Sequence, residues 1–457
     1  MSGKTTRRSR GGKTVPAWLA DTGIHTVVVA FPDTYGRLMG KRLTRDHFVE
    51  HVLAGGTHAC NYLLTVDIEM NPLPGFALAS WDQGYGDFHL AIDAPTLRPA
   101  PWVPGTAIVL GDLEHENGDP VGEAPRSILR TQLTALANLG LGASMASELE
   151  FYLFDEDYRA ARAKDYRDLR ASSDYLIDYH LLGTARDEDV LARVRNEIAG
   201  AGIDVEGTKG EWGKGQYELN LLYAEALEMA DRHVLAKHAA REIAQQQERS
   251  ITFMAKWQSD EAGSSCHVHT SLWDRQHRQN RFAGRSGPTP LFRHFLGGLL
   301  KYGRELSYFF APTVNAYKRY QAASWAPTAL VWAHDNRTTG YRVVGDGPGL
   351  RIENRMPGAD VNPYLAYAAT LAAGLRGIEE KIDCGDPYEG NAYEDPRLPR
   401  LPGSLAEAAD LLHGSAVARS AFGDRVVDFY VHTARLESEA YRQAVTDWER
   451  QRYFERV

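Results

Sequence analysis

The chain has 457 residues, of which 43% are hydrophobic, and a formal net charge of −9 at pH 7. This length predicts a globular protein with at least one large core and two or three domains. The acidic balance argues against a general nucleic-acid-binding protein, and no apolar run reaches the roughly 18 residues of a membrane-spanning helix, so we expect neither nucleic acid nor a membrane as a partner.

The N-terminal third begins with a tail and then turns to short strands. Residues 1–14 are basic and rich in Gly, Ser and Thr, which predicts a disordered tail. The run TVVVAF at 26–31 predicts a strand, and the turn P-D-T-Y-G follows it. Short strands and turns continue to about residue 112. The segment 112–125 is polar and rich in Gly, Pro and acidic residues, as is typical of a linker. We therefore expect a second, larger domain beyond it.

The second domain alternates predicted helices with strands. A helix is expected at 126–139, a strand at 143–154 and a long helix at 224–247. Two helix starts carry sequence signals. Asn362 precedes Pro363, which fits an N-cap with proline at the first helical position, and Ser404 stands at capping-box spacing from Glu407.

Cysteine usage indicates the compartment. Cys60, Cys266 and Cys384 are far apart and odd in number, so neither a disulfide framework nor a zinc pair is indicated. A cytoplasmic location is the expectation.

The strand predicted at 143–154 contains two acidic residues. Side chains alternate along a strand, so Glu148 and Glu150 point to the same side. Two ionised carboxylates this close are costly to bury unless a cation lies between them or one keeps its proton. In the alternative reading, both face solvent from an edge strand.

Other stretches of the second domain offer metal ligands. Glu211 and Glu218 flank the glycine-rich segment 213–215, which permits a bend that brings both carboxylates to one region, although a plain surface hairpin is the alternative. His267 and His269 have strand spacing, which suits a metal or phosphate site and equally suits two partnered core histidines.

Charged residues near the end of the predicted sheet suit phosphate. Arg351, Glu353 and Arg355 would line one face of a strand, with a solvated face as the alternative. Three further arginines stand beside turn-forming Asn or Gly: Arg319, Arg337 and Arg342. Arginines together with carboxylates are what a phosphoryl-transfer site needs, because carboxylates hold divalent metals while metals and arginines hold phosphate.

Taken in order, these segments resemble the glutamine synthetase family along almost the whole chain. The matching motifs are DTYGRLMGK, GDFHLAIDAPTLRPAPW, SELEFYLF, GQYE, HVHTSL, NAYKR, DNRTTGYR and RIENRMPGADVNPYL. The resemblance implies an α+β fold with a β-grasp-like N-terminal domain at 15–113. A larger glutamine-synthetase-type α/β catalytic domain, with ATP, glutamate and metal sites, follows at 121–457.

The resemblance also implies the roles of site residues. One Mg²⁺ or Mn²⁺, of two or three per site, would be held by Glu150, Glu211 and Glu218, and another by Glu148, His267 and Glu353. Arg319 and Arg355 would hold glutamate and the transferring phosphoryl group, and Gly263 would contact the backbone of the amino-acid substrate. ATP would be contacted by Tyr223, His269, Ser271, Arg337, Arg342 and Arg351.

The implied reaction is ATP-dependent amide formation on the γ-carboxylate of glutamate through a γ-glutamyl phosphate, as part of nitrogen metabolism. The family's flap glutamate, which handles ammonium, is replaced here by Trp325, and Asp67 is the nearest candidate for the ammonium-binding aspartate. An indole cannot take a proton but can hold an alkylammonium group. We therefore expect an organic amine as acceptor, with polyamines such as putrescine or spermidine first.

Three alternatives stay open. They are a γ-glutamylethanolamide synthetase, an ordinary glutamine synthetase that uses ammonium, and a non-catalytic structural or regulatory relative. The resemblance also implies a homo-oligomer, a dodecamer of two hexameric rings, with each active site between the first domain of one subunit and the second domain of its neighbour.

Overall fold

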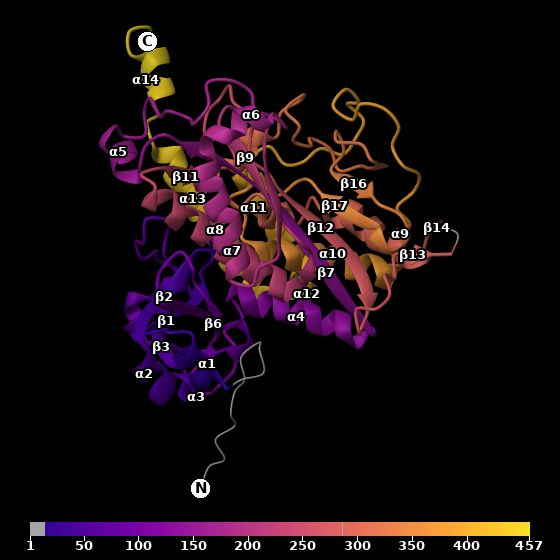
Figure 1. The fold of residues 1–457 in the computed structure, drawn as a ribbon. Helices are drawn as coiled ribbons and strands as arrows, with labels where there is room; N and C mark the ends of the chain where they lie inside the picture. The colour runs from indigo at the N-terminus through magenta and orange to yellow at the C-terminus, as the bar shows by residue number, and fades with distance from the viewer. Residues whose placement is uncertain (1–13, 286) are drawn as a thin grey trace.

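A computed structural model describes residues 14–285 and 287–457 (Figure 1). The tail expected at 1–14 therefore lies outside the described residues, apart from its last one. The α+β class predicted from the sequence is confirmed by two separate mixed arrangements of strands and helices. The first, drawn in indigo, forms a lobe beside the larger body of the molecule (Figure 1).

The first sheet has the strand order β2-β1-β6-β4-β3, with β5 beside β6. Its strands are β1 (Thr26–Pro32), β2 (Leu38–Thr44), β3 (Thr57–Cys60), β4 (Asp87–Ile92), β5 (Arg98–Pro99) and β6 (Thr106–Glu114). The helices of this region are α1 (Val15–Asp21), α2 (Arg45–His47) and α3 (Leu53–Gly55). β1 and β2 form an antiparallel hairpin, and β6 returns parallel to β1, which gives the β-grasp-like arrangement.

The larger sheet has the order β15-β16-β17-β12-β7-β9-β8, with β10 and β11 also paired to β7. Its strands are β7 (Leu141–Phe154), β8 (Val205–Gly210), β9 (Gln216–Leu221), β10 (Ala224–Glu225), β11 (Ser250–Thr252), β12 (Cys266–Asp274), β15 (Trp332–His334), β16 (Tyr341–Val344) and β17 (Arg351–Asn354). A short separate ribbon pairs β13 (Ala283–Gly284) with β14 (Gly287–Pro288). β7 is the longest strand among the described residues, and it pairs with β12, β9, β10 and β11.

Helices support the larger sheet. They are α4 (Pro125–Asn138), α5 (Tyr158–Ala163), α6 (Leu181–Thr184), α7 (Glu188–Gly200), α8 (Ala226–Gln246), α9 (Pro290–Tyr302), α10 (Pro363–Glu380), α11 (Leu405–Gly414), α12 (Ala416–Phe422), α13 (Asp424–Gln443) and α14 (Asp447–Tyr453). α4 and α8 pack against β7, and the largely buried α10 packs on α4, α8 and α9. The apolar faces of these helices are buried, and buried side chains interdigitate at close to crystal density. This packing holds β7 in a fixed position.

A buried ion-pair cluster joins the two lobes. The guanidinium group of Arg126 lies 2.8 Å from Asp93, 2.6 Å from Asp112 and 2.7 Å from Asp231. Arg126 and Asp231 are buried, while Asp93 and Asp112 come from the first lobe. Because a buried charge is tolerated only when it is paired and hydrogen-bonded, this cluster fixes one docking position for the lobes.

The expected elements are present with shifted ends. The strand expected at 143–154 starts at 141, and the helix expected at 224–247 spans 226–246, because residues 224–225 pair with β7 instead. Asn362 caps α10 as expected, since its side chain accepts a hydrogen bond from the backbone N–H of Tyr364 at 3.1 Å. Ser404 accepts one from Glu407 at 3.2 Å, but the Glu407 carboxylate accepts from Gly403 rather than from the cap residue, so only half of the capping box forms.

The domain limits stay a proposal. The first sheet ends at Glu114 and α4 begins at Pro125, so we propose a boundary between them, and the expected domains 15–113 and 121–457 stay a prediction. Among the described residues, no helix is both long enough and apolar enough to cross a membrane.

Candidate active site

The site is built on β7. β12 pairs with β7 on one side and places His267 opposite Glu148, while β9 pairs on the other side and places Glu218 opposite Glu150. β17 continues the sheet beyond β12, with Glu353 opposite His269. Since alternate residues share a face, this register brings the acidic and imidazole side chains to one side of the sheet.

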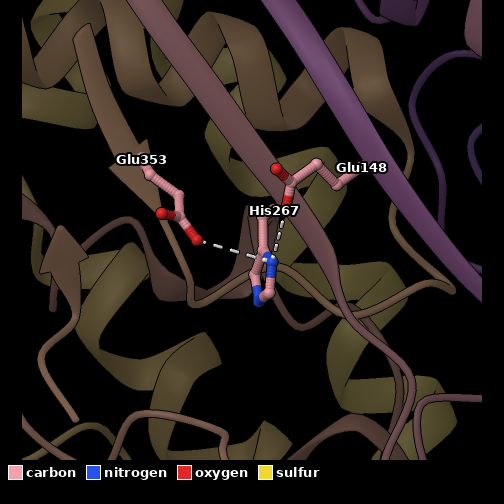
Figure 2. Close-up of side chains that lie close together, drawn as sticks. All are labelled: Glu148, His267 and Glu353. Atoms are coloured by element: carbon pink, nitrogen blue, oxygen red, sulfur yellow. Dashed lines mark hydrogen bonds and ion pairs between the residues drawn. The ribbon is translucent and has the colours of Figure 1, made fainter. Parts of the chain in front are cut away.

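The first cluster consists of Glu148, His267 and Glu353, whose ligand atoms all lie within 4.8 Å of one another (Figure 2). The Nδ1 atom of His267 lies 3.0 Å from Glu148 Oε2 and 3.5 Å from Glu353 Oε1. The Nε2 atom of His269 lies 2.9 Å from the other Glu148 oxygen. Burial opposes ionisation of Glu148, but hydrogen bonds from the two histidines outweigh it and hold the pKa of this carboxyl far below its ordinary value.

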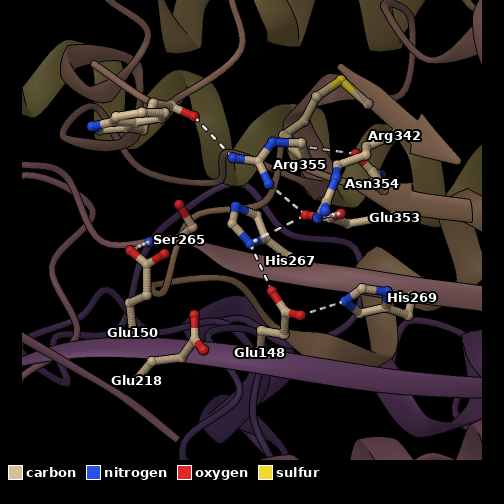
Figure 3. A network of polar contacts seen from close by, with 12 residues as sticks. Glu148, Glu150, Glu218, Ser265, His267, His269, Arg342, Glu353, Asn354 and Arg355 are labelled. Carbon is tan, nitrogen blue, oxygen red and sulfur yellow. Dashed lines mark hydrogen bonds and ion pairs between the residues drawn. The ribbon is translucent and has the colours of Figure 1, made fainter. Parts of the chain in front are cut away.

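Arginines complete the first cluster (Figure 3). Nη1 of Arg342 donates to Glu353 Oε2 at 2.8 Å, and Arg355 forms an ion pair with the other oxygen. Burial alone would raise the pKa of Glu353, but the charges of His267 and Arg355 lower it to about 2. The carboxylates of this cluster are therefore ionised at neutral pH.

The second cluster consists of Glu150, Glu211 and Glu218, again with ligand atoms within 4.8 Å of one another. Glu150 accepts hydrogen bonds from the backbone N–H of Ser265 at 2.7 Å and from the side chain of Gln216 at 3.2 Å. Burial, together with the charge of Glu211, raises the pKa of Glu150 to about 8. Burial and the charges of Glu148 and Glu211 raise the pKa of Glu218 to about 9. With all three carboxyls ionised, this cluster would hold more negative charge than Lys209, which pairs with Glu211, neutralises.

Both clusters fit divalent cations. The second offers only carboxylate oxygens, which hard cations prefer, and the closeness of its carboxyls adds to the effect of burial in raising the pKa values of Glu150 and Glu218. The first adds an imidazole, and the Nε2 atom of His267 is buried without a hydrogen-bond partner among the described residues. These are the six residues expected as ligands. The structure brings them together in the expected two sets, and their role as metal ligands stays a prediction.

A cavity of about 280 Å³ opens onto both clusters. Five of the six candidate ligands line it, all except Glu353. It is also lined by several of the residues expected to contact substrate or phosphate: Gly263, Trp325, Arg337, Arg342 and Arg355. Arg337 and Arg342 thus belong to this cavity.

A second cavity of about 470 Å³ is lined by other residues expected to contact ATP: Tyr223, His269, Ser271 and Arg351. Glu148 lines both cavities, so the two meet at the first cluster. The rings of Tyr223 and Trp273 are nearly parallel, at 14°, with centroids 6.4 Å apart. Flat aromatic faces of this kind suit the planar base of a nucleotide.

Arg319 and Asp67 lie elsewhere. Within the described part of the chain, neither lines these two cavities. Arg319 is buried and donates to Ser265 Oγ at 3.1 Å, and a side chain on Gly263 would overlap its alkyl chain. The Asp67 carboxylate accepts hydrogen bonds at 2.9 and 2.8 Å from backbone N–H groups of its own loop. The roles expected for both residues stay predictions.

Sequence reasoning missed several cavity residues. Trp273 was missed although a signal was present, because His267, His269, Ser271 and Trp273 alternate along β12 and so share one face. Trp212 was missed because it lies in a glycine-rich turn, where no periodicity shows which way a side chain points. Lys209, which pairs with Glu211, was missed because it belongs to no sequence motif that indicates a role in the site.

Comparisons with known proteins agree with this geometry. The family model of the glutamine synthetase catalytic domain matches residues 122–453. The chain is 50% identical to γ-glutamylethanolamide synthetase GlnA4 of Streptomyces coelicolor, over 98% of this chain and 96% of that one. It is 37% identical to a glutamate–isopropylamine ligase of a Pseudomonas species, over 94% and 95%. A solved structure of GmaS in complex with ADP superposes with a TM-score of 0.84 at 27% identity, over 96% of this chain and 99% of that one.

The family match and the likeness to named glutamate–amine ligases identify the class of this protein as an ATP-dependent ligase that forms carbon–nitrogen bonds. The chain belongs to the glutamine synthetase family. The expected resemblance to the branch that acts on organic amines, rather than to the ammonium-using enzymes alone, is confirmed.

Proposed function

We propose that the protein joins the γ-carboxylate of glutamate to a small organic primary amine, with ethanolamine as the first candidate. The observation that carries this proposal is Trp325, which stands in the cavity beside both clusters where a flap carboxylate was expected. Its ring is half-exposed, so an aromatic surface faces the acceptor. The likeness to the Streptomyces ethanolamide synthetase supports ethanolamine ahead of the polyamines expected first from the sequence.

The charges of the cavity suit phosphoryl transfer. Arg337, Arg342 and Arg355 line it, and guanidinium groups bind phosphate and carboxylate oxygens in a bidentate manner. ATP would lie in the second cavity with its terminal phosphate toward the first cluster, and the arginines would orient the γ-carboxylate of glutamate toward that phosphate. A carboxylate oxygen would attack the terminal phosphorus, the bond to ADP would break, and γ-glutamyl phosphate would form. The uncharged amine nitrogen would then attack the acyl carbon, phosphate would leave, and the nitrogen would give up a proton to solvent.

The six candidate ligands would hold two divalent cations. When bound, such ions neutralise the charge that develops on the transferring phosphoryl group. His269 and Arg342 would keep Glu148 and Glu353 ionised and oriented for this task, because each contacts one carboxylate oxygen at 2.9 or 2.8 Å. The presence of all six residues argues against a non-catalytic relative.

We also propose a homo-oligomer in which a second copy completes the acceptor site. Asp67 supports this, because it does not line either of the two cavities that adjoin the carboxylate clusters. Native mass spectrometry tests it. A fully active monomer would contradict it.

The function is tested by incubating the protein with ATP, Mg²⁺, glutamate and one amine at a time. The amines are ammonium, ethanolamine, putrescine and spermidine, and the readouts are phosphate release and the mass of the amide. We expect the ethanolamide as the main product. Rapid turnover with ammonium and none with the organic amines would contradict the proposal, and Glu150→Gln serves as the control that loses activity with every amine.

A further inference from the structure

Trp212 is a half-exposed aromatic residue in the turn between β8 and β9. It follows Glu211 directly, and its backbone N–H donates to Glu211 Oε2 at 3.3 Å. Its ring meets that of Trp325 edge to face, with centroids 5.7 Å apart and an interplanar angle of 64°. The two side chains are 47% and 49% exposed, and both line the cavity that contains the clusters. Two large apolar side chains left this open beside a polar site call for a ligand that covers them.

Each tryptophan is fixed to a different carboxylate cluster. Trp212 is fixed through Glu211 to the second cluster. The carbonyl oxygen of Trp325 accepts a hydrogen bond at 3.2 Å from Arg355, which pairs with Glu353 of the first cluster. The aromatic pair therefore spans the two clusters, and its position is set by the groups that would hold glutamate and phosphate.

The backbone around Trp325 supports a functional role. Trp325 has a φ of +64° and Ala323 a φ of +58°, both in the left-handed region that residues with a side chain rarely adopt. Strain of this kind persists where the surroundings impose it, and it concentrates at functional sites. The indole that contacts Trp212 belongs to one of these two residues.

We infer that Trp212 is a specificity-determining residue, which together with Trp325 forms the wall against which the acceptor amine packs. The inference rests on the proposed function and deepens it. The ligand class is a primary amine with a short alkyl or hydroxyalkyl chain. Its carbon atoms pack on the indole rings, and its ammonium group, before deprotonation, is attracted to the aromatic faces and to the nearby carboxylates Asp178 and Glu211. Ammonium has no carbon to pack and gains less from the wall.

The test compares Trp212→Ala and Trp212→Phe with the wild type. With ATP and glutamate saturating, kcat and KM are measured for ethanolamine, methylamine and ammonium. We expect Trp212→Ala to raise the KM for ethanolamine about tenfold, with about a twofold change or less for ammonium, as loss of one aromatic contact predicts. Trp212→Phe should keep most of the preference. The KM for glutamate and the Mg²⁺ dependence should stay as in the wild type.

Two further variants make the result specific. Trp448→Ala, which removes a tryptophan 60% exposed on α14, should leave amine preference unchanged. The double variant Trp212→Ala/Trp325→Ala should lose less kcat/KM for ethanolamine than the product of the two single-variant losses, because the two rings form one surface.

The inference is overturned if Trp212→Ala loses activity equally with ethanolamine and ammonium, or changes only the Mg²⁺ dependence, since Trp212 would then merely support Glu211. An unchanged amine preference overturns it as well. A wild type that makes no amide from any organic amine would instead overturn the proposed function, so the two failures are distinguishable.

Discussion

Metal binding to the second cluster should release protons. Glu150 and Glu218 have pKa values raised to about 8 and about 9 in the metal-free protein. At pH 7 both carboxyls are therefore largely protonated, which allows the pair to release at most two protons. The two carboxyls interact, so these pKa values belong to the pair rather than to either residue alone. Because metal ligands bind in the deprotonated form, we expect Mg²⁺ or Mn²⁺ to displace between about one and two protons at pH 7.

Isothermal titration calorimetry measures this number directly. Mn²⁺ is titrated in buffers of different ionisation enthalpy, and the slope of the observed binding enthalpy against the buffer ionisation enthalpy gives the number of protons released. The affinity for Mn²⁺ should also rise with pH between 6 and 8. Glu150→Gln is the matched control, because it keeps the shape of the side chain and should lower the release by about one proton. Zero release in the wild type, with affinity independent of pH, would refute the reasoning.

The same shifts predict the pH dependence of stability. A carboxyl whose pKa is raised above its ordinary 4.5 contributes stability that is fully present below that value and is lost as pH rises. The metal-free protein should therefore lose stability between about pH 4.5 and pH 9 as these two groups ionise. Added Mn²⁺ should restore it. Thermal unfolding measured across this pH range, with and without metal, shows whether stability falls or rises. A metal-free protein whose stability rises as Glu150 and Glu218 ionise would contradict the prediction.

Three further predictions follow from single side chains. Glu353→Ala should lower ATP-dependent amide formation well beyond about tenfold with the fold intact, as circular dichroism and a phosphate-release assay would show, and near-normal turnover would rule out its role. Trp325→Glu should raise the ratio of ammonium to ethanolamine use about tenfold, measured as kcat/KM, and an unchanged ratio would place selectivity elsewhere. Arg126→Met should cost about 3–5 kcal/mol in urea unfolding, because it leaves Asp231 buried without its cation, and a loss below about 1 kcal/mol would contradict that.

Much of the site could be predicted because side chains alternate between the two faces of a strand. Glu148 and Glu150 had to share a face once 143–154 was recognised as a strand, and the same holds for His267 and His269 on β12. The assignment of each glutamate to a different cluster could not be derived from this alternation. It depends on the pairing register with β9, β12 and β17, and only the family resemblance supplied it.

Residues outside regular elements were harder to place. Trp212 lies in a turn whose side-chain directions follow no period, and Arg319 packs inward behind Gly263 although its motif suggested a substrate contact. The large helical support for β7 was predicted only in part, because the position of α10 depends on contacts between residues far apart in the sequence. Sequence patterns describe local geometry, whereas these placements depend on tertiary packing.

A competition assay tests the central claim most directly. The protein is incubated with ATP, Mg²⁺, glutamate and equal concentrations of ammonium, ethanolamine and putrescine, and the amides are quantified by mass spectrometry. The product ratio equals the ratio of the kcat/KM values for the three amines. The account predicts that γ-glutamylethanolamide is the main product and glutamine a minor one. Glutamine as the dominant product would contradict it.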